Sequence, residues 1–453
     1  MVSTLIALAA VSSYINYRYI RLPTTIGVML VALVASLALI LAGPYASGLR
    51  EQAATQVAHI DFDQVVLHGM LAFLLFAGSI HVKLDELSRE WPAISLLAIV
   101  GTLSSTFIVG GAAWAVLGWL DLPIPLLHAL LFGALISPTD PIAVLGLMKS
   151  AGAPRQLEVQ MAGESLFNDG LGVVIFMVLL QLAGLDGTHG AAAPLSFDIG
   201  TVGMLLLKEV GGAVVLAMGA GIVTYQMLKR VDNYQVEVLL TLALAMGLYA
   251  LADALHLSAP IAVVVAGLFV GNRGRAFAMS EKTREHVDTF WELVDEILNV
   301  VLFLLIGLEL LVLPIERGWL VAGALSIVIV LSARWLSVAA IIGPLRGVTA
   351  QAKGAIAVLT WGGLRGGISV AMALSLPAND SRSLILTLTY FVVVFSILVQ
   401  GLTVGWVIRM AGRSRAAVKP APGLAGAVDI RSKSSGTQRG NLTKGVPNDH
   451  TTQ

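Results

Sequence analysis

The stretch Gly133-Ala-Leu-Ile-Ser-Pro-Thr-Asp-Pro-Ile142 sets two prolines and an aspartate inside an otherwise apolar run. Each proline lacks a backbone N–H, and its ring clashes with the preceding helical turn. Pro138 and Pro141 together predict a break near the middle of a helix, with Thr139 and Asp140 on extended backbone. Broken backbone at membrane depth is tolerated only where it is buried in protein or lines a cavity. We therefore interpret this stretch as a functional site and not as a simple kink.

The composition around this stretch is that of a membrane protein. Of the 453 residues, 57% are hydrophobic and only 12% are charged, whereas about 25% are charged in a typical soluble chain. So little charge cannot cover a soluble surface, and lipid is expected to surround most of the chain. Basic and acidic residues both number 28, so the global charge does not indicate nucleic-acid binding. The absence of cysteine excludes a disulfide framework, thiol catalysis and a zinc ribbon.

Apolar stretches that approach the length of a membrane crossing recur along the chain. A bilayer core about 30 Å thick needs about 20 mostly apolar residues per helix. The sequence therefore predicts an all-α polytopic membrane protein with about thirteen transmembrane helices. The thirteen stretches cover residues 2–20, 23–43, 62–81, 92–118, 124–148, 157–184, 200–228, 234–255, 258–272, 292–313, 318–342, 353–377 and 383–410.

The distribution of charge between these stretches predicts the orientation in the membrane. Fourteen lysines and arginines lie in the loops on one side, against three on the other. We expect the chain to lie in the cell (inner) membrane. Because basic loops stay in the cytoplasm, its N-terminus is expected outside and its C-terminus in the cytoplasm. Residues 411–453 carry seven basic and two acidic residues among many Ser, Gly, Pro and Asn. This composition predicts a disordered cytoplasmic tail.

The stretch Gly163-Glu-Ser-Leu-Phe-Asn-Asp-Gly170 carries four oxygen-bearing side chains. At about 100° per residue, Glu164 and Asn168 fall at about 0° and 40° around the helix. Ser165 and Asp169 follow at about 100° and 140°, so one face carries all four. These ligand types suit a hard cation. A polar patch that packs helices together is the alternative, but two carboxylates are a costly means of joining helices in lipid.

The stretch Thr360-Trp-Gly-Gly-Leu-Arg-Gly-Gly-Ile-Ser369 places one arginine among four glycines. Glycines weaken a helix and let other backbone approach closely, so a second break is predicted, around Gly363 and Gly366. Arg365 keeps its charge and needs an anionic partner or a dipole. This stretch and the proline stretch are separated by an odd number of crossings. Two broken helices of opposite direction are typical of inverted-repeat transporters, whose substrate binds near the midplane.

Other polar residues inside the apolar stretches carry weaker signals. Asp295 and Glu296 lie at a predicted cytoplasmic entrance, where they could guide cations, although a solvated face is the favoured interpretation. Asn299 could form a hydrogen bond between helices. No phosphate-binding loop, His-Glu-x-x-His or Gly-x-Ser-x-Gly motif is present in the sequence. The sequence therefore favours a transporter over an enzyme, and it predicts no cofactor.

Four motifs together resemble the monovalent cation:proton antiporters, and in particular the NhaP-type sodium/proton exchangers, which are related to the eukaryotic sodium/hydrogen exchangers. The resemblance covers about residues 5–410. The motifs are Ser137-Pro-Thr-Asp-Pro141, Gly163-Glu-Ser-Leu-Phe-Asn-Asp-Gly170, Phe303-Leu-Leu-Ile-Gly-Leu-Glu309 and Gly363-Leu-Arg-Gly-Gly367.

The resemblance implies a homodimer of thirteen-helix subunits. Within a transmembrane domain of residues 1–410, it implies a core of about residues 92–184 and 318–410. The dimerisation part would then comprise about residues 1–81 and 200–313.

The resemblance also implies roles for the residues at the two breaks. Asp169 would be the carboxylate that binds either the cation or the proton, and Arg365 would balance the charge of Glu164. Further cation-site residues would be Asp140, Ser165, Asn168 and Thr139, with Pro138, Pro141, Gly363 and Gly366 in support.

The activity implied is exchange of Na⁺ (or Li⁺, or K⁺) for H⁺ by alternating access. Asn168 stands where electrogenic relatives in this superfamily carry a second aspartate, so exchange is expected to be electroneutral, one for one. A gated cation channel of the same composition is the alternative. A channel needs a continuous pore with repeated filter elements, whereas the polar residues here concentrate at one site.

Overall fold

Helices make up the part of the chain that the computed structural model describes. This part comprises residues 2–42, 47–58, 62, 64–140, 142–185, 199–313, 316–347, 351–377 and 379–413. It contains no β-strand, so the all-helical prediction is confirmed for these residues. Pro141 and the predicted tail from residue 414 onward lie outside the described residues.

The first half of the chain contains α-helices and short π-helical turns (η). In chain order they are α1 (Val2–Ile15), η1 (Asn16–Ile20), α2 (Thr24–Leu41), α3 (Ser47–Ala58), η3 (Gln64–Met70), α4 (Leu71–Ile80), α5 (Leu84–Arg89), α6 (Trp91–Leu96), η4 (Leu97–Gly101), α7 (Thr102–Trp119), α8 (Leu126–Ile136), α9 (Ile142–Ser150) and α10 (Arg155–Leu182).

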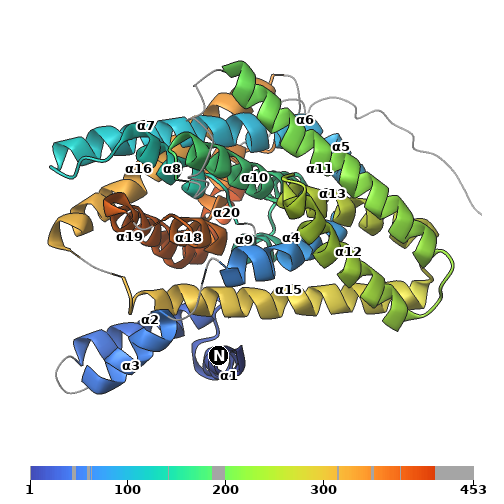
Figure 1. The fold of residues 1–453 in the computed structure, drawn as a ribbon, viewed down its shortest axis with the longest axis horizontal. Helices are drawn as coiled ribbons and strands as arrows, with labels where there is room; N and C mark the ends of the chain where they lie inside the picture. Colours follow the sequence, from blue (N-terminus) through green and yellow to red (C-terminus); the bar gives the residue numbers. More distant parts are fainter. Residues whose placement is uncertain are drawn as a thin grey trace, which may run out of the picture. The chain divides into compact units, whose positions relative to one another are not determined.

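The second half is built in the same way (Figure 1). Its helices are α11 (Ile199–Leu228), α12 (Tyr234–Ala254), α13 (Ala259–Phe269), η5 (Val270–Gly274), α14 (Arg275–Phe277), α15 (Glu281–Glu309), α16 (Arg317–Leu345), α17 (Ala355–Gly362), α18 (Gly367–Leu374), α19 (Asp380–Phe395), η6 (Ser396–Gln400) and α20 (Gly401–Arg413).

Seven helical spans in the described residues are long and apolar enough to cross a bilayer. Three apolar helical spans are shorter, which leaves the count of about thirteen crossings as a prediction. The long spans are Thr24–Leu41, Trp91–Trp119, Arg155–Leu182, Gly203–Leu228, Tyr234–Ala254, Gly318–Leu345 and Ser381–Ala411, and the short ones are Val65–Ile80, Leu126–Ile136 and Ala259–Gly274.

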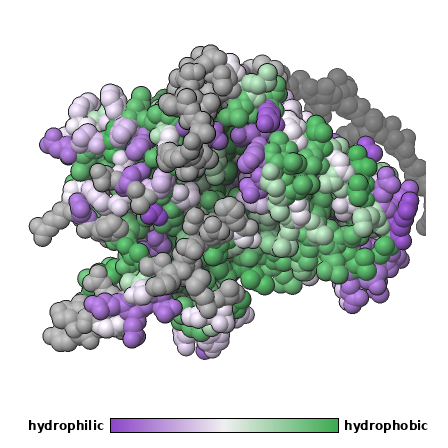
Figure 2. All heavy atoms as spheres, in the orientation of Figure 1, coloured by the Kyte–Doolittle hydropathy of each residue, from purple (hydrophilic) through white to green (hydrophobic). Residues whose placement is uncertain are grey.

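Hydrophobic side chains cover much of the outer surface, as lipid exposure requires. Figure 2 shows them gathered over one broad region of the visible face, with hydrophilic residues near its margin. On α11, Leu207 and Val215 are largely exposed. Such a surface is favourable against acyl chains or another apolar protein surface and unfavourable against water.

Both predicted helix breaks are present. α8 ends at Ile136 and α9 begins at Ile142, while α17 ends at Gly362 and α18 begins at Gly367. The first break follows from Pro138, which cannot continue the helical hydrogen bonds. The long helix α10 contacts α8, α17 and α18, and therefore passes beside both breaks.

The helices pack mainly within two groups. α7 contacts α8 and α16, and α16 also contacts α17 and α19. In the other group, α15 contacts α2, α4 and α12, and α13 contacts α4, α11 and α12. The assignment of these groups as a moving core and a dimerisation part stays a prediction.

Candidate functional site

The two helix breaks meet through backbone hydrogen bonding. The N–H of Asp140 donates to the carbonyl of Leu364 at 2.8 Å, and the two residues form an isolated antiparallel bridge. A broken helix leaves N–H and C=O groups without intrahelical partners, and these must be satisfied where water is excluded. The hydrogen bond therefore satisfies a free N–H of the first break and a free carbonyl of the second.

Arg365 is the second link between the breaks. Its Nη1 donates to the carbonyl oxygen of Pro138 at 2.9 Å and to that of Ser137. Its own N–H donates to Oγ of Ser396 at 2.9 Å. The side chain is only 2% exposed. A guanidinium at the C-terminal end of α8 satisfies free carbonyls and is stabilised by the negative end of the helix dipole.

Glu164 forms its ion pair with Arg334 on α16 and not with the predicted Arg365, which lies within electrostatic reach of Glu164. Nη2 of Arg334 donates to Oε2 of Glu164 at 2.9 Å, and Nη1 donates to Oε1. Nη2 also donates to the carbonyl of Leu359 at 3.0 Å. The pair is therefore bidentate, with two hydrogen bonds between the side chains. Glu164 is 1% exposed and Arg334 is 4% exposed, so the pair is almost completely shielded from solvent.

The role of Arg334 was not predicted from the sequence, although its position indicates that it needs a partner. The residue lies within the apolar stretch 318–342, and a charged side chain at such a position is costly without a partner. The sequence shows that Arg334 needs an anion. The choice of Glu164 depends on how α16 crosses α10, which no spacing within a single helix reveals.

Two glycines permit the close approach of charged groups at the second break. A Cβ added at Gly363 would lie 2.7 Å from Nε of Arg334. A Cβ added at Gly366 would lie 2.3 Å from Oδ2 of Asp140. Neither distance is compatible with normal packing, so a larger residue would displace a charged side chain at either position.

Thr139, Ser165 and Asn168 form a fully buried hydrogen-bonded group. Nδ2 of Asn168 donates to Oγ1 of Thr139 at 2.9 Å, and Oδ1 of Asn168 accepts from the N–H of Thr139 at 3.3 Å. The hydroxyls of Thr139 and Ser165 are 3.0 Å apart. This group fixes the extended backbone of the first break against α10.

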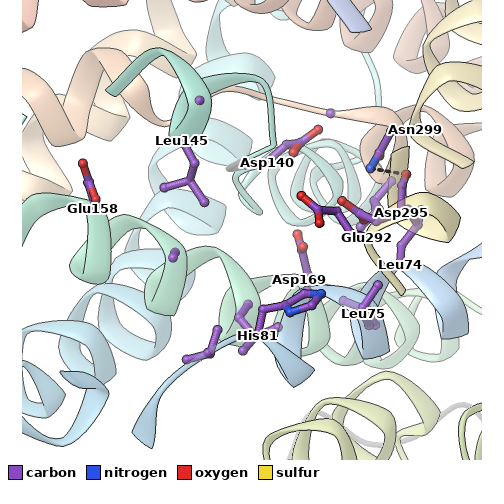
Figure 3. Close-up of a pocket in the computed structure, with 18 of the residues that line it drawn as sticks. Leu74, Leu75, His81, Asp140, Leu145, Glu158, Asp169, Glu292, Asp295 and Asn299 are labelled. Atoms are coloured by element: carbon purple, nitrogen blue, oxygen red, sulfur yellow. Dashed lines mark hydrogen bonds between the residues drawn. The ribbon is translucent and has the colours of Figure 1, made fainter. Parts of the chain in front are cut away.

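Asp140 and Asp169 line a cavity of about 760 Å³. The cavity reaches the exposed side chains of Lys83 and Arg155. In the described part of the chain, no hydrogen bond or ion pair is formed by the Asp169 carboxylate. Figure 3 shows the two carboxylates around one space, together with Asp295 on α15. The arrangement offers hard oxygen ligands to a cation in this cavity.

A charge cluster lies at the mouth of this cavity. Arg155 donates to Oε2 of Glu86 from Nη2 at 2.6 Å, and to Oε2 of Glu158 from Nη1 at 2.8 Å. The hydrogen bond from Arg155 lowers the pKa of Glu86 below its usual value. The contact joins α5 to the start of α10, but an exposed pair of this kind adds little to stability.

Comparison with known proteins places these features in a family. The model for the transmembrane part of sodium/hydrogen exchangers matches residues 6–410. The chain is 50% identical over 419 residues to the Na⁺/H⁺ antiporter NhaP of Pseudomonas aeruginosa, covering 90% of this chain and 96% of that protein. It is 34% identical over 401 residues to the Na⁺/H⁺ antiporter NhaH of Halobacillus aidingensis, covering 87% and 93%.

A solved structure shares the fold. The sodium proton antiporter MjNhaP1 from Methanocaldococcus jannaschii matches with a TM-score of 0.70 at 20% sequence identity. The match covers 90% of this chain and 96% of that chain.

Proposed function

Because the chain belongs to the sodium/hydrogen exchanger family, we propose that it is a secondary antiporter that exchanges Na⁺ for H⁺ across the cell membrane. Li⁺ and K⁺ are further candidate substrates on ligand chemistry alone. The exchange would serve pH and sodium homeostasis. The N-terminus lies outside and the C-terminus lies in the cytoplasm in this proposal, as the basic loops indicate.

The observation that carries this proposal is the position of Asp169. Its carboxylate faces the cavity beside Asp140, without a hydrogen-bond or ion-pair partner in the described residues. An anionic carboxylate in such a place is stabilised by a bound cation or by a proton, and the two exclude each other. Asp169 therefore binds one ion in each half-cycle.

The surrounding groups hold this carboxylate in place and support a one-for-one exchange. Asn168, beside it, is hydrogen-bonded to Thr139 and cannot titrate. Glu164 is already paired with Arg334 and does not line the cavity. With Asp140 also remaining charged, a single group titrates in the cycle. The loaded site then has the same net charge with Na⁺ as with H⁺.

The transport step in this proposal is alternating access. The core, residues 92–184 and 318–410, carries the loaded site past the dimerisation part of a homodimer. The two breaks support such a movement because their joined ends can travel together with the bound ion.

The variant Asp169→Asn tests the proposal. Asparagine keeps the volume and hydrogen bonding of the side chain but can neither release a proton nor carry charge. In reconstituted vesicles with a preset pH gradient, we expect the wild type to dissipate the gradient only when Na⁺ is added. Asp169→Asn should abolish this activity while its melting temperature stays near that of the wild type.

A matched control is Asp253→Asn, which removes an exposed aspartate from the end of α12. It should leave exchange unchanged. Sodium-driven proton movement that persists in Asp169→Asn would refute the assignment. A wild-type Na⁺ current without coupled proton movement would indicate the channel.

A further inference from the structure

α15 presents a line of polar side chains to the cavity that contains the proposed ion site. Asp288, Glu292, Asp295 and Asn299 all line it. Their spacings of four, three and four residues place them within about 60° of one another around the helix. Figure 3 shows Glu292, Asp295 and Asn299 beside the space that Asp140 and Asp169 also face.

Asn299 is the innermost member of this line and has an unusual hydrogen-bonding state. Its side chain is 1% exposed, and Nδ2 donates to the carbonyl of Asp295 at 2.8 Å. The amide oxygen Oδ1 is buried without a hydrogen-bond partner among the residues that the structure describes. Buried polar atoms without partners are rare in native proteins. Because Nδ2 is bound to its own helix, the orientation of the amide is fixed and Oδ1 is left as an available ligand.

The carboxylates near Asn299 form a region of concentrated negative charge. Asp295 lies within electrostatic reach of Asp140, Glu292 and Glu296. In the described part of the cavity wall, the basic residues Lys83, Lys149 and Arg155 lie on elements other than α15, near the mouth. A cation held between Asp295 and Asn299 would reduce the repulsion among these carboxylates.

We propose that the Asp295 carboxylate and Oδ1 of Asn299 form a second binding position for the transported monovalent cation, between the cavity mouth and Asp169. This inference rests on the antiporter function proposed above. Oxygen ligands of these two kinds suit Na⁺, Li⁺ and K⁺. The cation binds first at α15 and then transfers to Asp140 and Asp169.

The second position and the proposed ion site lie on opposite sides of the boundary between the two groups of helices. Asp295 and Asn299 lie on α15, in the group that also contains α2 and α4, whereas Asp140 and Asp169 lie in the group built around α8 and α10. Movement of one group against the other would separate the second position from Asp140 and Asp169. The second position can therefore pass a cation to the site only when the cavity faces the side of Lys83 and Arg155.

The test compares Asn299→Ala and Asp295→Asn with the wild type in vesicle exchange assays. We expect each variant to raise the Na⁺ concentration for half-maximal exchange by about tenfold, the effect of losing one charge-assisted contact. The maximal rate should change less. Asn299→Asp keeps an oxygen ligand at the same place and should retain the wild-type half-saturation or improve it.

Glu296→Gln is the matched control, because it removes the same charge one residue further along α15. Glu296 is exposed and does not line the cavity. Its half-saturation should equal that of the wild type. An equal effect of Asp295→Asn and Glu296→Gln that disappears at high ionic strength would mean long-range attraction without a bound ion, which would overturn the proposal.

A binding measurement separates this inference from the proposed function. Asp169→Asn, which should not exchange ions, should still gain thermal stability from Na⁺, because ligands of the folded state raise its stability. Adding Asn299→Ala should remove this remaining gain. If Asp169→Asn alone removes all Na⁺-dependent stabilisation, there is no second position. If the wild type shows no Na⁺-dependent proton movement, the antiporter function itself fails.

Discussion

Two arginines buried near the helix breaks have different tasks. Arg334 neutralises Glu164 through two hydrogen bonds, and Arg365 satisfies the carbonyls at the end of α8. Both are stable in this environment because each has fixed acceptors. Glu164 is thus held by Arg334 away from the cavity that Asp140 and Asp169 line.

This division predicts how paired substitutions behave. Arg334→Met should lower the stability of the folded protein by about 3–5 kcal/mol, because it leaves the Glu164 charge buried without its partner. Adding Glu164→Gln should recover much of this loss. The same addition to Arg365→Met should recover much less. Thermal melts of the single and double variants in detergent provide the coupling energies, and equal coupling to both arginines would contradict the structure.

At the scale of elements, the site depends on two broken helices held together at their ends. Asp140 donates to Leu364, and Arg365 binds carbonyls at the first break. The side chains at the site are therefore positioned by backbone contacts between α8–α9 and α17–α18. Gly366 is required because the Asp140 side chain occupies the space beside it.

The variant Gly366→Ala tests this contact. Its new methyl group would lie 2.3 Å from Oδ2 of Asp140, so the aspartate must shift. We expect exchange to fall by about tenfold or more, since small displacements in a preorganised site have large effects. The control Gly111→Ala, on α7, meets no atom within 4 Å and should preserve exchange. Wild-type sodium affinity in Gly366→Ala would exclude a role for Asp140 placement.

At the scale of the whole molecule, the charge carried per cycle follows from the number of titrating groups. With Glu164 paired and Asn168 neutral, the proposal predicts exchange of one Na⁺ for one H⁺. A cycle that moved one net charge would gain about 2.3 kcal/mol per 100 mV, which is a bias of about fifty-fold in the equilibrium gradient.

The measurement is Na⁺ distribution in vesicles at zero potential and at an imposed potassium-diffusion potential, after checking that K⁺ is not transported. The equilibrium distribution should be the same in both conditions. A distribution that follows the imposed voltage would rule out one-for-one exchange, and the role of Asn168 would need another explanation.

The sequence by itself determined the class of the protein and the positions of its two breaks. Pro138 cannot continue a helix, and the glycines around Arg365 weaken one, so both breaks follow from local chemistry. The angular positions of Glu164 and Asp169, about 140° apart on one helix, also follow from spacing alone. These properties depend only on residues that are close together along the chain, so they can be predicted from the sequence alone.

Only the tertiary structure decided which charges meet. Glu164 and Asp169 are about 140° apart around α10. Glu164 contacts Arg334 on α16, whereas Asp169 lines the cavity beside Asp140. The pairing with Arg334, the carbonyl partners of Arg365 and the free oxygen of Asn299 all depend on how helices cross. Burial makes an ion pair necessary in lipid, but the partner is set by the distance between residues far apart in the chain.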